Sequence, residues 1–342
     1  MIESQARASA RTNFDTAYYA DCLRMMMRIR AFEEVALEAL REKLIHGAIH
    51  PSIGQEAVAV GVCRQLRADD ILLSTHRGHG HTLAKGADVT AMMCELFGKA
   101  GGTCQGKGGS MHIADFKIGM LGANGVVAAN ITIAAGAAHA VKLKGEDRIV
   151  ACFFGDGAVN RGPFLEGLNW AKIYALPVLF ICEDNGYAAT TRSAALTAGP
   201  GPAARAESLG VPATTVDGND IVAMDEAARD LIKAVRGGAG PRFLLAKTYR
   251  LTGHTGADPA LYRPQAEVEE RRRRDPLLLA AALLGDSGVG AEEIASWREL
   301  AQREMRAAYA VARAAPWPEA RLAFADVQDI GDPQTRAYCW PN

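Results

Sequence analysis

Two apolar runs that end in polar residues constrain the fold more than any other part of the sequence. The first run, 149–154, is followed by the letters GDG, and the second, 178–182, by EDNGY. An amphipathic segment lies between them, so the order predicts a strand, a helix and a second strand. A right-handed crossover makes such strands parallel and brings their C-terminal ends to one edge of a sheet. Asp156 and Asn185 are therefore expected to lie close together.

The residue types at these two strand ends indicate a phosphate and metal site. Asp156 lies between two glycines, which allow close approach of a ligand and can turn backbone N–H groups toward an anion. A carboxylate, an amide oxygen and a nearby carbonyl form part of the oxygen shell that Mg²⁺ prefers, with room for water and phosphate oxygens. Either motif alone fits a plain turn, but together they favour the metal site.

The rest of the chain alternates strand-like and helix-like segments. This alternation predicts an α/β fold with a doubly wound parallel sheet flanked by helices. The expected strands cover 69–74, 149–154, 178–182, 213–217 and 243–249, and the expected helices cover 18–44, 57–66, 89–97, 221–235 and 291–315. We expect one domain over 1–342, with its core at about 45–260 and a helical extension at about 265–342.

Three segments allow more than one interpretation. The glycine-rich stretch 98–125 is expected to be an ordered loop that serves a substrate or cofactor. The small residues of 130–143 fit either a simple buried helix or a close contact with the interior or a subunit. The letters EVEERRRR at 267–274 could form an anion site, but a solvated helix face is the favoured interpretation.

Composition excludes several function classes. The chain has 342 residues and a net charge of −1. It therefore lacks the excess of positive charge that binds nucleic acid or an anionic membrane. No apolar run approaches the roughly 20 residues that span a bilayer, and the first residues lack the apolar centre of a signal peptide. The seven cysteines are scattered without paired spacing. They predict reduced thiols and a cytoplasmic location.

Several motifs along the chain resemble those of a known family. GDG followed by Asn185 resembles the thiamine diphosphate fingerprint, and EDNGYA resembles the form in alpha subunits of the E1 component of acetoin and 2-oxo acid (pyruvate) dehydrogenase complexes. The likeness covers nearly the whole chain. It includes GQEA at 54–57, HRGHGH at 76–81, GKGGSMH at 106–112, GANGVV at 122–127 and TYRLTGH at 248–254.

The resemblance implies a thiamine diphosphate and Mg²⁺ site. The ion would be held by Asp156, Asn185 and the carbonyl of Tyr187, and the backbone of Gly157 and Ala158 would contact the diphosphate. Asp184 replaces the first asparagine of the family's pair, a position that is not a metal ligand in the family.

Other residues receive their roles from the same likeness. Arg77 would contact the diphosphate, and His76 occupies a cofactor-binding place that is Tyr in many pyruvate enzymes. Gly125 would offer its backbone to the aminopyrimidine, while Val127 would hold the cofactor in a bent shape. The two expected catalytic residues are His50 and His254, which would serve proton transfer and acyl transfer to a lipoyl arm.

The resemblance also implies partners and a substrate class. A beta subunit would complete an α2β2 heterotetramer and supply the glutamate beside the pyrimidine; the single predicted sheet agrees that this chain holds half of a site. A lipoyl-bearing E2 acyltransferase would accept the acyl group. HRGHGH favours acetoin as the small carbonyl substrate, with pyruvate or another 2-oxo acid as the alternative. Thr252 and the segment 131–133 depart from the family pattern.

Two other functions fit parts of the sequence but not the whole. His46 and His50, and the histidines of HRGHGH, could suggest a zinc enzyme, but Gly47 and Pro51 disrupt a helix between the first two and no HExxH occurs. A non-catalytic assembly subunit would not need Asp156, Asn185, Arg77 and His254. The segment 252–257, with its two glycines, is expected to be a mobile loop at the mouth of the site.

Overall fold

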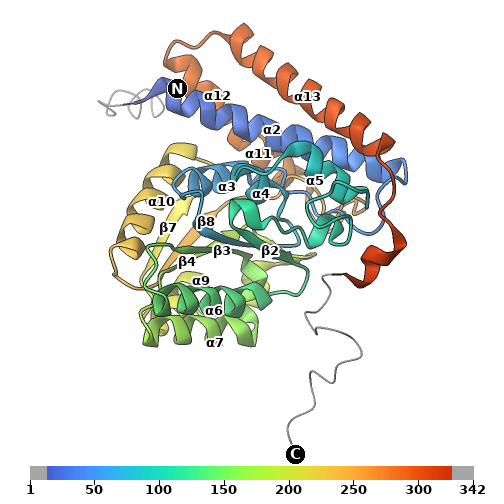
Figure 1. Ribbon diagram of the computed structural model, residues 1–342. Helices are drawn as coiled ribbons and strands as arrows, with labels where there is room; N and C mark the ends of the chain where they lie inside the picture. The colour runs from blue at the N-terminus through green and yellow to red at the C-terminus, as the bar shows by residue number, and fades with distance from the viewer. Residues whose placement is uncertain (1–13, 326–342) are drawn as a thin grey trace, which may run out of the picture.

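A six-stranded, all-parallel sheet lies at the centre of the protein (Figure 1), whose computed structural model describes residues 14–325. In order across the sheet the strands are β2 (Met120–Asn124), β1 (Ile71–Thr75), β3 (Val150–Gly155), β4 (Val178–Asp184), β8 (Arg242–Lys247) and β7 (Ala213–Asp217). The two central strands, β3 and β4, are apolar on both faces, as strands covered on both sides must be. The predicted doubly wound α/β fold is confirmed.

Helices cover both faces of the sheet. One face of the sheet packs against α6 (Ala129–Leu143), α7 (Gly162–Ile173) and α9 (Pro202–Ser208). The other face packs against α3 (Glu56–Cys63) and α10 (Ile221–Arg236). Alternate residues of β3 enter the two cores: Cys152 and Phe154 join the first, and Ala151 and Phe153 join the second. This alternation follows from the two-residue period of a strand.

A third layer of helices lies outside α3 and α10 (Figure 1). It contains α2 (Thr16–Arg41), α5 (Val89–Leu96), α12 (Pro276–Asp286) and α13 (Ala291–Ala314). The long helices α2 and α13 lie side by side, and Arg28 joins them by two hydrogen bonds to Glu304, of 2.7 and 2.6 Å. The helical character expected beyond residue 265 is thus found up to residue 314, and residues 326–342 of the expected extension lie outside the described part.

Shorter elements complete the chain around the sheet edge. They are α4 (His79–Ala84), α8 (Ser193–Leu196), α11 (Gln265–Arg272), the antiparallel pair β5 (Tyr187–Ala188) and β6 (Thr191–Arg192), and the 3-10 turns Gly109–Met111, Phe116–Ile118, Asp156–Asn160 and Ala320–Phe324. No helix in residues 14–325 is both long and apolar enough to cross a membrane.

The prediction of a loop over the whole of 98–125 was wrong at its end, where β2 forms an edge strand. The strand is short and contains Gly122, so it carries no apolar run that would mark it in the sequence. The stretch before it is ordered by one buried carboxylate. Glu95 accepts hydrogen bonds from four backbone N–H groups between residues 104 and 109, at 2.7 to 3.0 Å.

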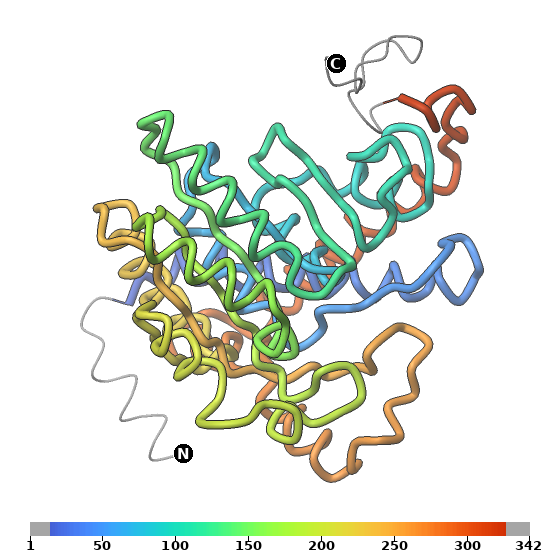
Figure 2. Tube along the Cα trace, turned by 90° about the horizontal axis from the view of Figure 1, so that it is seen from below, coloured from blue at the N-terminus to red at the C-terminus, as the bar shows by residue number. Residues whose placement is uncertain are grey.

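The buried-helix interpretation of segment 130–143 holds for one face of α6, and the subunit contact stays a prediction. Its inner face is buried against the sheet through Ile131, Ala134 and Ala138, whereas Ile133 on the outer face is 44% exposed. Figure 2 shows α6 and α7 lying side by side along one face of the molecule.

Candidate active site

The C-terminal ends of the central strands open into one cavity of about 350 Å³. Open parallel sheets bind their ligands at this edge. Every site residue expected from the sequence lines this cavity: His50, His76, Arg77, Gly125, Val127, Asp156, Gly157, Ala158, Asn185, Tyr187 and His254. The sequence motifs therefore converge in space, although they come from segments up to about 200 residues apart.

One end of the cavity presents oxygen atoms. Gly155 of β3 lies opposite Glu183 of β4, so Asp156 and Asn185 follow directly after neighbouring strands. The Asn185 amide donates to Gln55 Oε1 at 2.8 Å, and its Oδ1 accepts the N–H of Tyr187 at 3.2 Å. A second lone pair of that oxygen stays available for an ion. This end, called the oxygen end below, consists of Asp156, Asn185 and the Tyr187 carbonyl.

The electrostatics of Asp156 suit a carboxylate that holds a cation. The side chain is 3% exposed, and burial followed by the negative charge of Asp184 raises its pKa to about 7. Ser193 donates a hydrogen bond to Asp156 Oδ2. A buried carboxylate without a partner of opposite charge is unstable as an anion. The carboxylate, amide and carbonyl oxygens thus fit the donor set of Mg²⁺.

Two buried guanidinium groups make the middle of the cavity positive. Arg77 donates to the carbonyls of Pro51 and His254, and Arg250 donates to the Ala189 carbonyl at 2.9 Å. Within residues 14–325 neither group pairs with a carboxylate at salt-bridge distance. Burial, followed by repulsion from Arg250, lowers the pKa of Arg77 to about 9. A bound diphosphate would relieve this repulsion, so the cavity fits a strongly anionic ligand.

Gly157 shows how closely the backbone must pack here. A Cβ at this position would lie 2.9 Å from the Cβ of Ala188, which belongs to β5. The strand β5 also contains Tyr187, so a larger residue at 157 would push the carbonyl of the oxygen end out of place. Glycine is needed here for close approach, as GDG suggested.

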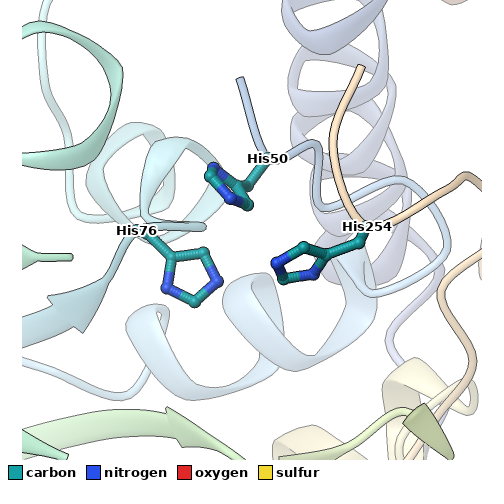
Figure 3. Close-up of side chains that lie close together, drawn as sticks. All are labelled: His50, His76 and His254. Carbon is teal, nitrogen blue, oxygen red and sulfur yellow. The ribbon is translucent and has the colours of Figure 1, made fainter. Parts of the chain in front are cut away.

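The other end of the cavity consists of His50, His76 and His254, whose rings face one another (Figure 3). The ring centroid of His50 lies 4.5 Å from that of His76 and 4.9 Å from that of His254. Burial, followed by the positive charge of Arg77, lowers the pKa of His50 to about 3, of His76 to about 2 and of His254 to about 4. All three imidazoles are neutral near pH 7. This cluster is called the imidazole end below.

The other histidines of HRGHGH do not reach the cavity. His79 bridges Glu33 Oε2 and Ser110 Oγ, each at 2.9 Å, and so ties α2 to the glycine-rich stretch. His81 shares a 2.8 Å hydrogen bond with Ser74 and stacks on Phe153. Both are buried within α4 and support the fold, so His76 is the one histidine of this motif that lines the cavity.

Comparison with known proteins settles the family. The chain matches the Dehydrogenase E1 component family over residues 24–321. The chain belongs to the dehydrogenase E1 component family. Its members are thiamine diphosphate-dependent oxidoreductases, and the resemblance seen in the motifs is confirmed.

Several curated relatives share much of their length with this chain. The alpha subunit of acetoin:2,6-dichlorophenolindophenol oxidoreductase from Bacillus subtilis is 47% identical over 74% of this chain and 76% of its own length. The protein of the same name from Cupriavidus necator is 42% identical over 86% and 88%. The pyruvate dehydrogenase E1 component subunit alpha from Rhizobium meliloti is 39% identical over 79% and 78%.

Several residues that line this cavity were not predicted from the sequence. Gln55, Met111, Glu183 and Arg250 also line the cavity. Gln55 and Arg250 belong to the GQEA and TYRLTGH motifs, and Glu183 precedes the Asp-Asn pair, so their motifs could have marked them. No motif marks Ser193. It lies next to Asp156 because the β5–β6 hairpin folds the chain back toward the cavity.

Glu267 corrects part of the expectation for EVEERRRR. Its carboxylate accepts hydrogen bonds from the hydroxyls of Tyr187, at 2.9 Å, and Tyr249, at 3.0 Å. It also forms an ion pair with Arg192. The side chain is 19% exposed, so it is not a plain solvated residue. The rest of α11 has no buried residue, as predicted. Helix α11 thus holds the loop that carries the oxygen end.

The loop at 252–257 uses its glycines for packing. A Cβ on Gly253 would lie 2.1 Å from the carbonyl oxygen of Asp258, and one on Gly256 would meet Leu37 at 2.5 Å. Asp258 Oδ2 accepts the N–H of His254 at 2.6 Å. The glycines are therefore explained by close contacts, not by backbone freedom, and mobility of this loop stays a prediction.

Proposed function

We propose that this chain is the alpha subunit of a thiamine diphosphate- and Mg²⁺-dependent E1 enzyme that cleaves acetoin and passes the acetyl group to a lipoyl carrier. The observation that supports this most is His76, the only histidine of HRGHGH that lines the cavity. This histidine form resembles the acetoin-cleaving branch. The two acetoin-named relatives, at 47% and 42% identity, support the same substrate.

The residues present fit the proposed cofactor. Asp156, Asn185 and the Tyr187 carbonyl would hold Mg²⁺, and Arg77 with the N–H groups of Gly157 and Ala158 would hold the diphosphate. When bound, thiamine diphosphate supplies a carbanion and an electron sink for cleavage of the bond next to a carbonyl.

Gly125 and Val127 would position the other half of the cofactor. Both line the cavity at the turn before α6, and Val127 remains 47% exposed. An exposed apolar side chain at a cavity mouth suits contact with an apolar ring system. The Gly125 backbone would then face the aminopyrimidine, as the family resemblance implies.

The imidazole end would handle protons and the acyl acceptor. The low pKa values of His50 and His254 arise from burial and the charge of Arg77, so a bound diphosphate anion would raise both toward neutrality. Near neutrality an imidazole can both give and accept a proton. The overall conversion splits acetoin into acetaldehyde and an acetyl unit; the lipoyl disulfide is reduced, one sulfur taking the acetyl group and the other a proton.

A beta subunit would complete the site. Six large apolar residues on α6 and α7, called the α6–α7 patch, are 41% to 78% exposed: Ile133, Leu143, Leu165, Trp170, Ile173 and Tyr174. Val126 and Val127 continue the exposed apolar surface to the cavity. A surface of this kind is typical of a protein interface. We place the beta subunit here, in an α2β2 heterotetramer, with a lipoyl-bearing E2 protein as the acyl acceptor.

Pyruvate or another 2-oxo acid is the second candidate substrate. The relative from Rhizobium meliloti named as a pyruvate dehydrogenase subunit, at 39% identity, supports it. A purely scaffolding subunit fits less well, because it would not need buried Asp156 and Arg77 in one cavity. The six described cysteines are free thiols, which agrees with the proposed cytoplasmic location.

The substrate is tested by dye reduction with the assembled enzyme. The chain is co-expressed with the reading frames adjacent to its gene and assayed over a panel of acyloins and 2-oxo acids. We expect kcat/KM for acetoin to exceed that for pyruvate at least about tenfold, or about 1.4 kcal/mol in transition-state stabilisation. The opposite preference would assign the protein to the pyruvate branch, and no reduction with any substrate would favour the scaffold.

A further inference from the structure

The imidazole end has the ligand chemistry of a transition-metal site. The three side chains come from the segment before α3, from the end of β1 and from the loop after β8, and each offers a ring nitrogen. These nitrogens all lie within 4.8 Å of one another, and the rings converge on a common point (Figure 3). We propose that His50, His76 and His254 bind a Zn²⁺-type ion, and that this ion blocks turnover while it is bound.

Two of the ring nitrogens have no partner in the described structure. The Nδ1 atoms of His50 and His254 are buried and form no hydrogen bond within residues 14–325. His50 as a whole is only 8% exposed. A buried polar atom without a partner costs about 1–3 kcal/mol. An ion that bound through either of these Nδ1 atoms would remove that atom's cost, so a bound metal would stabilise the cluster.

The geometry suits three nitrogen ligands and one open position. Zinc sites of this type use three protein ligands and water, with Zn–N distances of about 2.0–2.1 Å. In a tetrahedral site with such Zn–N distances the nitrogens lie roughly 3.3 Å apart, so they must approach by up to about 1.5 Å, which rotations of the side chains can supply. The cavity provides space for the fourth ligand.

The two ends of the cavity would select different ions. The oxygen end offers a carboxylate, an amide and a carbonyl, which suit Mg²⁺, whereas imidazoles favour zinc, copper and nickel. An ion at the imidazole end would occupy the lone pairs that His50 and His254 need for proton transfer. Inhibition rests on the proposed function, but binding of the metal does not.

The test begins with binding to the purified full-length chain, without substrate. Zinc chloride is titrated by calorimetry in excess Mg²⁺ at pH 7, and Co²⁺ is added separately to record the visible absorption of a four-coordinate site. We expect 1:1 binding that His76→Tyr and His50→Gln each weaken by more than about 100-fold, above the loss caused by an outer-shell partner. The matched control is His46→Gln, because His46 is an exposed histidine four positions from His50.

The inference is overturned if wild type and His76→Tyr bind Zn²⁺ equally, or if wild type does not bind it in excess Mg²⁺. An equal loss in His46→Gln would also overturn it, by placing the ion elsewhere. Two ligand variants are used, with circular dichroism, so that misfolding of one does not decide the result. In the assembled enzyme, zinc should stop dye reduction and a chelator with resupplied Mg²⁺ should restore it. Absence of acetoin activity would defeat the proposed function and leave the binding result intact.

Discussion

The two ends of the cavity differ in how the chain builds them. The oxygen end comes from neighbouring strands of one crossover unit, and its ligands follow directly after β3 and β4. The imidazole end comes from His50, His76 and His254, which only the folding of the whole sheet brings together. Local topology creates the first end, and global topology creates the second.

The ends also differ in how they respond to protons. Burial raises the pKa of the Asp156 carboxyl to about 7, because burial disfavours an anion. The same cause lowers the pKa values of the three histidines to between about 2 and 4, with Arg77 adding to it. Near neutral pH the oxygen end therefore titrates, whereas the imidazole end stays neutral. Variants at each end should therefore have different effects.

The largest effect is expected from removing the carboxylate of the oxygen end. Asp156→Ala should abolish thiamine diphosphate binding in the assembled enzyme, because the proposed Mg²⁺ loses its only anionic protein ligand. The fold should survive, since a buried carboxylate without an ion-pair partner does not stabilise it. Titration calorimetry measures the affinity, and thermal unfolding measures the stability. Wild-type affinity in this variant would remove Asp156 from the metal site.

A smaller and more selective effect is expected at the imidazole end. His254→Ala should lower acylation of the lipoyl carrier about 10²-fold or more, as the loss of an acid–base group does. Cofactor affinity should change by less than about 1 kcal/mol, the size of one hydrogen bond. Acylation is followed in single turnovers and affinity by calorimetry. The N–H of His254, which bonds Asp258, is kept in this variant, so the loop retains its anchor.

Equal losses in both measurements would instead make His254 part of the cofactor site. No loss in either would leave it as a residue that shapes the loop. Asp156→Ala provides the matched contrast, because it should remove cofactor binding first and turnover as a consequence.

The oxygen end could be predicted from the sequence more fully than the imidazole end. The crossover unit, with Asp156 and Asn185, was predictable because apolar runs and strand-end motifs are local signals. Resemblance assigned roles to His50, His76 and His254, but their mutual contact depends on the order of β1, β3 and β8 in the sheet. Strand β2 was missed because it is short and contains glycine. The role of Glu267 was missed because its charged neighbours obscured one carboxylate that turns inward.

The smallest effect expected is a pH dependence that belongs to the oxygen end alone. Metal binding requires the Asp156 carboxylate to lose its proton. Its pKa is raised to about 7 before the ion binds, so protons compete with Mg²⁺ below pH 7 and not above it. Cofactor affinity should be level from pH 7 to 8 and fall by up to about tenfold per pH unit below 7. Calorimetry at pH 6, 7 and 8 in constant Mg²⁺ measures this.

Two variants separate this titration from ionisation of the cofactor itself. Asp156→Asn removes the proton-binding group but keeps a neutral oxygen ligand, unlike Asp156→Ala. At high Mg²⁺ the weaker affinity that remains should lack the additional fall below pH 7, while any change due to the diphosphate remains. Asp184→Asn removes the charge that, after burial, contributes most to raising the pKa of Asp156. The onset of the fall should then move to lower pH. The imidazoles cannot produce such a shift. A rise of their pKa values on cofactor binding would strengthen affinity as pH falls, and it would be the same in all three proteins. An onset that is the same in all three proteins would show that Asp156 does not control metal binding.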